Sequence, residues 1–277
     1  MRLTLGYSPC PNDTFIFWAL AKALVAAPSL SLSPVVRDVQ ALNELCLSGR
    51  LDVSKVSCHA MAFLAPRYAV LAAGAAMGRG VGPILVARRP FALEELSRKT
   101  VAAPGALTTA HLLLLLREPG LKGRVVQMSF QEVLKAVASG QVDAGVLIHE
   151  GRFVYEAHGL LCLLDLGQWW EAHTGLPLPL GGLVARRRLG KGLLRELEEL
   201  VRRSILYAWA HPEEAMPYVR QHAQELKEDV LRRHIELYVN GYSVQMGPEG
   251  QEALRELLRR AHEAGLCPAF REPLFAE

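Results

Sequence analysis

Several features that would place a chain in a common class are missing from this sequence of 277 residues. Its five cysteines form an odd number without a CxxC spacing, which argues against a disulfide framework and against a zinc site of paired cysteines. The longest apolar stretches, residues 69–76 and 111–116, are far shorter than the roughly 20 residues that span a bilayer. The first residues lack the basic, apolar and small-residue order of a secretory signal. We therefore predict a cytoplasmic protein without membrane insertion.

The chain also lacks a large excess of positive or negative charge. Lysine and arginine number 31 against 28 aspartates and glutamates, and the net charge of +3 is spread along the chain as short arginine pairs. Nucleic-acid binding requires a basic stripe or patch, so no nucleic-acid partner is expected. No Walker loop, HExxH, GxSxG or paired metal-ligand spacing is present, and the glycine-rich segment 78–82 precedes a predicted strand instead of opening a helix. The sequence therefore predicts no metal site and no dinucleotide site.

The chain does contain an internal repeat. Ser48–Val56 is echoed by Ser139–Leu147, each after an amphipathic helix (39–47 and 131–138) and each leading into an apolar strand. Two further pairs of segments follow in the same order: Pro9–Thr14 with Pro104–Thr109, and Val86–Arg89 with Val184–Arg187. Three ordered echoes predict two α/β lobes of like topology that face one another. A two-lobed α/β protein of this kind binds a ligand in its cleft.

The limits of the lobes follow from two apolar segments, 81–88 and 180–187, which we interpret as the strands where the chain crosses between lobes. The first lobe is then discontinuous, with residues 1–85 and 186–277, and residues 86–185 form the second. With 51% hydrophobic residues, the chain is long enough for two modest cores. Three helical segments are predicted to pack on the first lobe: 193–209, one that begins at Pro212, and 229–238.

A helix begins at a matching place in each lobe. In the first lobe, a strand leads through a turn to a helix at 14–26, with Asn12 or Asp13 as its N-cap. In the second lobe, a strand leads to a leucine-rich helix capped by Thr108 or Thr109. Helix N-termini carry unpaired N–H groups and partial positive charge, so two of them in one cleft predict a site for a carboxylate or a polarised oxygen. Taken singly, each is equally an ordinary cap.

Polar residues follow the predicted strand in each lobe. The apolar segment 142–148 is typical of a buried parallel strand, and His149 follows it. Because the carboxyl ends of parallel strands line the crevice of an open α/β sheet, His149 is placed beside the ligand. Its ordinary pKa near neutrality suits a general base, and the alternative is a structural histidine. In the first lobe, Ser57 offers a hydrogen bond, and Lys55 either balances a substrate carboxylate or points to solvent.

Other reactive side chains are weaker candidates. His59 lies in the helix predicted after the first-lobe strand, and Cys58 would need a base and an electropositive setting to act as a nucleophile. The remaining histidines fall in helical surface patterns, which indicate solvated faces.

The segments that carry this argument also resemble a known family. They are Gly6–Phe15, Lys55-Val56-Ser57, Gly78–Pro83, Ile148-His149-Glu150 and Thr174–Gly181. Together with residues 208–215, they resemble the 1,4-dihydroxy-6-naphthoate synthase family over most of the chain. The resemblance implies a two-lobed, periplasmic-binding-protein-like fold of type II and a role in the futalosine route to menaquinone. It also implies a carbon–carbon lyase that converts cyclic dehypoxanthinylfutalosine to 1,4-dihydroxy-6-naphthoate and releases a three-carbon fragment.

The resemblance carries over a set of site residues. It makes His149 the catalytic base and names five substrate contacts: Lys55, Val56 and Ser57 from the first lobe, and Thr108 and Thr109 from the second. Further cleft residues are Asn12, Asp13, Thr14 and Asn43. Neutral His149 would take a proton from the substrate before C–C cleavage and aromatisation, with no metal or organic cofactor. The loop Gly105-Ala106-Leu107 departs from the more polar loop expected before the threonine pair.

Three other readings stay open at this point. A non-catalytic protein that binds a small carboxylate has the same architecture, although such a receptor normally carries an export signal. Chorismate dehydratase acts on the same route with a similar two-lobed fold. A ligand-sensing regulatory domain would need an attached helix-turn-helix segment, which is not evident. In each case the expected partner is a small-molecule carboxylate, and a homodimer is compatible with the sequence.

Overall fold

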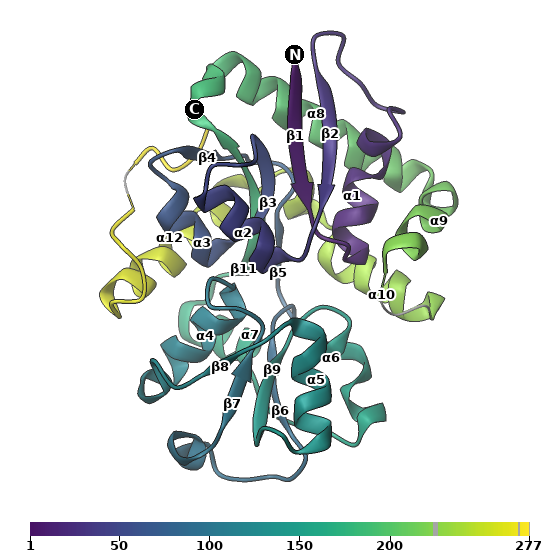
Figure 1. Cartoon of the computed structure of the whole chain (residues 1–277). Helices are drawn as coiled ribbons and strands as arrows, with labels where there is room; N and C mark the ends of the chain where they lie inside the picture. The colour runs from purple at the N-terminus through teal and green to yellow at the C-terminus, as the bar shows by residue number, and fades with distance from the viewer. Residues whose placement is uncertain (224–226, 271, 277) are drawn as a thin grey trace.

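Two β-sheets divide the molecule into an upper and a lower lobe in Figure 1, which shows the computed structural model. The structure describes residues 1–223, 227–270 and 272–276. The first sheet has the order β2-β1-β3-β11-β4, with β5 paired to β11, and the second has the order β10-β6-β9-β7-β8. The first sheet consists of β1 (Arg2–Tyr7), β2 (Ser31–Val36), β3 (Val53–Ser57), β4 (Tyr68–Val70), β5 (Ala76–Gly78) and β11 (Leu178–Arg186). The second consists of β6 (Ile84–Ala87), β7 (Val101–Ala103), β8 (Val126–Gln127), β9 (Ala144–Leu147) and β10 (Leu161–Asp165).

The internal repeat corresponds to one helix–strand unit in each lobe. Helix α2 (Val39–Leu47) leads into β3, and α5 (Phe130–Ser139) leads into β9, as the echo predicts. The start of α5 is fixed by a capping box of Ser129 and Glu132, and its end by Gly140 with φ of 80°. All residues of β3 and β9 are buried, and β9 is apolar throughout, whereas β3 also buries Ser54, Lys55 and Ser57. Strand β9 is shorter than the strand predicted at 142–148. It is parallel to β7 but antiparallel to β6, so the prediction of a parallel strand holds on one side only.

The first helix begins and ends earlier than predicted. Helix α1 (Pro11–Ala21) starts directly after Cys10, whose side chain makes no capping hydrogen bond. The prediction of Asn12 or Asp13 as N-cap is therefore wrong, because proline at the first helical position already starts the helix. The helix ends at Ala21 instead of residue 26. Two residues later, Ala23 adopts a left-handed φ of 55°, which a continuing helix does not allow. Asn12 and Asp13 consequently lie in the first turn, and both are buried.

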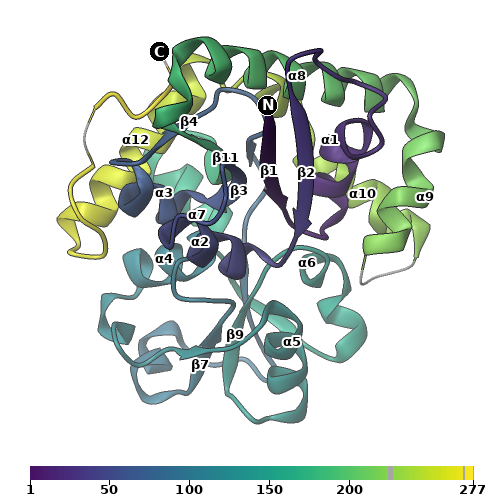
Figure 2. The same cartoon turned by 45° about the horizontal axis from the view of Figure 1, so that its top comes forward.

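Long helices complete the first lobe, as the sequence predicts. They are α8 (Gly190–Ala210), α9 (Pro212–His222) and α10 (Glu228–Tyr238). All three contact α1, which lies between β2 and the pair α9 and α10 in the turned view of Figure 2. The sequence reading did not define α12 (Gly247–Glu263), which packs on α3 (Cys58–Leu64) and β11. The remaining helices are α4 (Thr109–Arg117), α6 (Gly151–Val154), α7 (Leu166–Thr174) and α11 (Gly241–Val244), with short 3-10 turns at 93–98, 119–121, 155–158 and 187–189.

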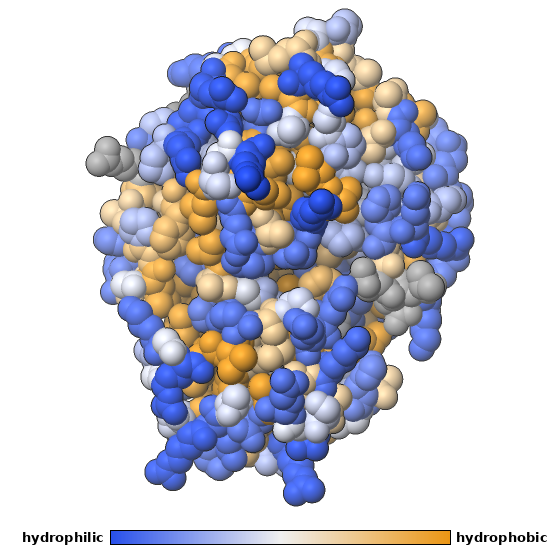
Figure 3. Space-filling view, in the orientation of Figure 1, coloured by the Kyte–Doolittle hydropathy of each residue, from blue (hydrophilic) through white to orange (hydrophobic). Residues whose placement is uncertain are grey.

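Apolar side chains are exposed in separate patches on the face drawn in Figure 3. Charged and polar side chains surround the apolar patches on the side drawn in Figure 3. None of the helices in the described ranges combines the length and apolar character that crossing a bilayer requires. The lobe limits of 1–85 with 186–277, and of 86–185, stay a prediction.

Two glycines allow the chain to pass close to α7 where it crosses into the second sheet. A Cβ on Gly82, whose φ is 152°, would lie 2.7 Å from the Cα of Gly167. A Cβ on Gly167 would overlap the carbonyl oxygen of Val81, which is backbone and cannot rotate away. The close approach of these two segments therefore depends on glycine.

We expect Gly167→Ala to lower the free energy of unfolding by about 1–3 kcal/mol, the usual cost of overpacking a tight contact. Urea titration followed by circular dichroism measures this change. Gly120→Ala is the matched control: its Cβ would meet no atom within 4 Å, so we expect a change within about 0.5 kcal/mol. Equal stability of the two variants would contradict the close packing at Gly167.

Candidate active site

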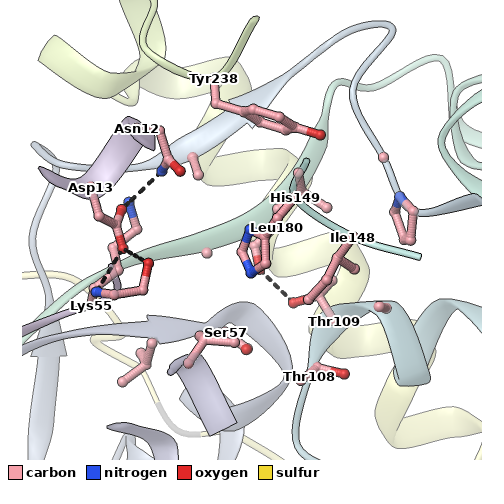
Figure 4. A pocket seen from close by; sticks show the side chains of 18 of the residues that line it. Asn12, Asp13, Lys55, Ser57, Thr108, Thr109, Ile148, His149, Leu180 and Tyr238 are labelled. Carbon is pink, nitrogen blue, oxygen red and sulfur yellow. Dashed lines mark hydrogen bonds and ion pairs between the residues drawn. The ribbon is translucent and has the colours of Figure 1, made fainter. Parts of the chain in front are cut away.

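A pocket lies between the two lobes, and residues from both sheets line it. The six site residues of the sequence reading are all among its lining: Lys55, Val56, Ser57, Thr108, Thr109 and His149. Figure 4 shows Asn12, Asp13 and Lys55 on one side of the pocket and Thr108, Thr109, Ile148 and His149 on the other. The cavity is about 90 Å³, whereas small-molecule sites usually measure roughly 300–1,000 Å³. A ligand with rings therefore requires the lobes to move apart and close again around it.

Lys55 is buried and already paired. Its Nζ lies 2.9 Å from Oδ1 of Asp13 and donates a 2.9 Å hydrogen bond to the carbonyl of Gly74. The side chains of Lys55 and Asp13 are only 4% and 3% exposed. Oδ2 of Asp13 accepts hydrogen bonds from the backbone N–H and the hydroxyl of Ser8, at 3.1 and 2.7 Å. The alternative that Lys55 points to solvent is wrong, and its charge is balanced within the protein.

Ser57 is held by an asparagine that does not itself line the pocket. Oδ1 of Asn43 accepts from the backbone N–H of Ser57 at 2.9 Å, and Nδ2 of Asn43 donates to the Ser57 hydroxyl at 3.1 Å. The same amide donates to the carbonyl of Leu107 in the facing lobe at 3.4 Å. Thr14 also lies outside the lining, because its hydroxyl donates to the carbonyl of Cys10 within α1. Of the four further cleft residues expected, Asn12 and Asp13 line the pocket.

Helix α4 begins at the pocket, as the repeat predicts. The Thr108 hydroxyl caps it by accepting from the backbone N–H of His111 at 3.2 Å. The hydroxyl of Thr109 donates to the carbonyl of Leu180 at 2.5 Å and so ties the helix start to β11. The N-terminus of α4 supplies partial positive charge beside the ligand space. At the N-terminus of α1, by contrast, Asp13 in the first turn already supplies a negative charge.

The apolar loop before the threonine pair has a structural reason. Gly105 has a φ of 118°, and a Cβ there would lie 2.7 Å from Oε1 of Gln40 on α2. The same oxygen accepts from the backbone N–H of Leu107 at 3.0 Å. The loop therefore packs directly on the first lobe, where a larger polar side chain at Gly105 would hold the lobes apart.

His149 follows β9 in a strained turn. Its φ is 54°, and Ala23 is the other non-glycine residue with a positive φ in the described ranges. Such conformations are uncommon outside glycine and gather at functional sites. The ring packs edge-on against Phe130, with centroids 5.1 Å apart. Burial lowers the pKa of His149 to about 4, an effect that Asp13 opposes and Lys55 reinforces. At neutral pH the imidazole is uncharged and can accept a proton.

A second histidine lies beside it that sequence reasoning missed. His234 on α10 is fully buried, lines the pocket, and has its ring centroid 6.2 Å from that of His149. Its Nε2 lies 3.0 Å from Oδ1 of Asn12. The assignment of the remaining histidines to solvated helix faces is therefore wrong for His234. The missed signal is the helical spacing of its buried neighbours: Val230, Leu231, Ile235 and Tyr238.

Tyr238, one turn after His234, is a further lining residue that was missed. Its ring packs against His234 with centroids 4.7 Å apart. Burial raises the pKa of Tyr238 to about 12, so it presents a neutral phenol to the pocket. His59 and Cys58 do not line the pocket, and burial raises the pKa of the Cys58 thiol, which disfavours its thiolate. In the part of the chain that the structure describes, no cluster of His, Cys, Asp and Glu is arranged to hold a metal ion.

The pKa of His149 predicts the pH dependence of a reaction in which it acts as base. Only the neutral imidazole accepts a proton, so activity is retained above its pKa and lost as the pH falls through it. We expect kcat/KM to be level from about pH 8 to about pH 5.5 and to decline with a midpoint near 4. Initial rates at varied pH, with circular dichroism to confirm folding, measure this. A midpoint near 6.5, the ordinary value, would contradict the buried setting of the base.

The sequence is similar to proteins of one known family over nearly its whole length. A family model described as "Menaquinone biosynthesis" matches residues 3–263. A curated protein of Thermus thermophilus named 1,4-dihydroxy-6-naphtoate synthase is 50% identical over 273 residues, which cover 99% of this chain and 98% of that protein. One of the same name from Streptomyces coelicolor is 45% identical, with 97% and 95% covered.

Solved structures show the same architecture. A protein of Archaeoglobus fulgidus is 35% identical and superposes with a TM-score of 0.90 over 96% of this chain and 98% of its own. The periplasmic aliphatic sulphonate-binding protein of Escherichia coli, at 13% identity, gives a TM-score of 0.65 over 97% and 89%. The two lobes with a pocket between them are thus a periplasmic-binding-protein-like fold, as the family resemblance implies.

Proposed function

Because the chain belongs to the menaquinone-biosynthesis family and is an enzyme of that route, we propose that it converts cyclic dehypoxanthinylfutalosine to 1,4-dihydroxy-6-naphthoate. The observation that carries this proposal is His149, an uncharged imidazole in a strained turn at the pocket between the lobes. The reaction is a carbon–carbon cleavage, so the enzyme is a lyase that releases a three-carbon fragment. Its substrate reaches it in the cytoplasm.

The first step is removal of a proton from the bound substrate by His149. A base with lowered pKa is a weak base in water, but the buried site also strips solvent from the substrate and holds the two groups at contact. Cleavage of the C–C bond then allows the ring to become aromatic, which makes the step downhill, and the imidazolium of His149 returns the proton to the products. The chain's own residues bind, orient and deprotonate, and no cofactor is part of the scheme.

The substrate carboxylate is placed at the start of α4. The lysine of the pocket is neutralised by Asp13, so the remaining positive potential comes from the helix N-terminus at Thr109. The hydroxyls of Ser57 and Thr108 line the same space. Opening of the lobes admits the substrate, and closure excludes water from the proton transfer.

The test is a pair of parallel incubations with wild-type protein, one with cyclic dehypoxanthinylfutalosine and one with chorismate, followed by mass spectrometry. We expect naphthoate from the first and no change in the second. Conversion of chorismate alone would make the chain a chorismate dehydratase. Binding of either compound without turnover would make it a carboxylate-binding protein.

A further inference from the structure

The buried hydrogen bonds around Asp13 determine where the protons lie on His234. Oδ1 of Asp13 forms the ion pair with the ammonium of Lys55 and also accepts a 2.9 Å hydrogen bond from Nδ2 of Asn12. A carboxylate that faces a lysine only accepts hydrogen bonds, so the amide group of Asn12 must turn its NH₂ toward Asp13. Its carbonyl oxygen Oδ1 therefore faces His234.

This orientation fixes the tautomer of His234. Because Oδ1 of Asn12 is an acceptor, Nε2 of His234 carries the hydrogen of their 3.0 Å contact. In a neutral imidazole the other nitrogen is then bare. Burial, together with the neighbouring His149, holds the pKa of His234 well below its usual range, which keeps the ring neutral. Nδ1 of His234 is thus a lone-pair acceptor.

That acceptor has no partner. Nδ1 of His234 is buried and makes no hydrogen bond within the described ranges. Leaving such an atom unsatisfied carries a free-energy cost that proteins usually avoid. His234 belongs to the first lobe, whereas the rings packed against it from the other side, His149 and Phe153, belong to the second. In Figures 1 and 2, α10 of the upper lobe lies on the side of the first lobe that faces α6 of the lower lobe. Opening the lobes separates these rings and exposes the pocket face of His234.

We propose that Nδ1 of His234 accepts a hydrogen bond from a hydroxyl group of the substrate when the lobes close around it. The inference rests on the proposed function and adds to it a binding residue from the lobe opposite the base. The ligand lies in the pocket that His149 and His234 both line, with the proton to be removed facing the first and a hydroxyl facing the second. A hydroxyl-bearing ligand then satisfies the atom that closure otherwise leaves unpaired, so it favours the closed form.

Two substitutions separate this role from a structural one. The side-chain amide of glutamine reaches the position of Nε2, so His234→Gln keeps a donor for Asn12 but loses the acceptor. The shorter amide in His234→Asn lies near the position of Nδ1, so it keeps an acceptor but loses the contact with Asn12. We expect His234→Gln to lower kcat/KM roughly 10- to 100-fold and to affect it more than His234→Asn. Urea titration of both variants reports folding separately, and we expect His234→Asn to be the less stable.

The order of the two activities decides the question. A residue that only supports Asn12 would give the reverse order, with His234→Gln close to wild type, and that result or equal losses would overturn the proposal. Nitrogen-15 spectra of histidine-labelled His149→Asn protein, which keeps the turn at this residue, give a second readout. We expect the His234 Nδ1 signal to be that of an unprotonated nitrogen and to move to lower frequency when cyclic dehypoxanthinylfutalosine is added. A protonated Nδ1, or no shift in the presence of bound substrate, would also overturn it. Absence of turnover by wild type, in contrast, would refute the proposed function itself.

Discussion

Replacing His149 by alanine is expected to lower kcat at least about 100-fold, because general-base catalysis contributes roughly 10²–10⁴ to a rate. The effect should fall on kcat more than on KM, since the ring's part in the proton transfer is realised only in the transition state. Stopped reactions at saturating substrate, analysed by mass spectrometry, measure it. Alanine is strained at a φ of 54°, so His149→Asn, which tolerates the left-handed conformation, is the variant that keeps the turn.

The control for this experiment is His173→Ala, a histidine on the exposed side of α7. We expect its kcat to equal that of the wild type. If His149→Asn retained activity within about threefold, His149 would not be the base. Another pocket residue would then take the proton.

Replacing Lys55 by methionine is expected to lower the free energy of unfolding by about 3–5 kcal/mol, the cost of leaving a buried charge without its partner. The carboxylate of Asp13 stays fixed by Ser8 and Asn12 in a site that is 3% exposed. Met has nearly the length of Lys, so the change removes the charge and the hydrogen bond to Gly74 rather than the packing. Urea unfolding at neutral pH gives the value.

The matched variant is Lys55→Met combined with Asp13→Asn, which removes both charges at nearly constant size. We expect it to recover more than half of the lost stability, because the two sites are in direct contact and their effects are not additive. Unfolding of Lys55→Met at the wild-type urea concentration would show that the pair is not a buried ion pair. A double variant as unstable as the single would show that the loss comes from packing.

The internal repeat made the architecture predictable. Helix–strand units at 39–57 and 130–147 have the same order of amphipathic helix, turn and buried strand, and the helices follow from local periodicity and caps. Apolar strands with polar ends then located the pocket, because strand ends of a sheet meet at one edge. That logic placed Ser57 and His149 on opposite sides of one cavity.

Other parts of the site depend on long-range packing that the sequence does not state. His234 lies 85 residues after His149 in the chain, and helix α10 brings the two rings together. The partner of Lys55 was likewise unknown, because the contact requires the start of α1 to lie against β3. Because α1 begins at Pro11, three residues before the predicted Thr14, Asp13 lies inside the helix and not at its cap.

The most direct test of the account is a single-turnover reaction with enzyme in excess over cyclic dehypoxanthinylfutalosine, in which both products are counted by mass spectrometry. A lyase that acts as we propose yields 1,4-dihydroxy-6-naphthoate and a three-carbon fragment in equal amounts, each matching the substrate consumed. Recovery of the substrate intact from a saturated complex would contradict the proposed reaction.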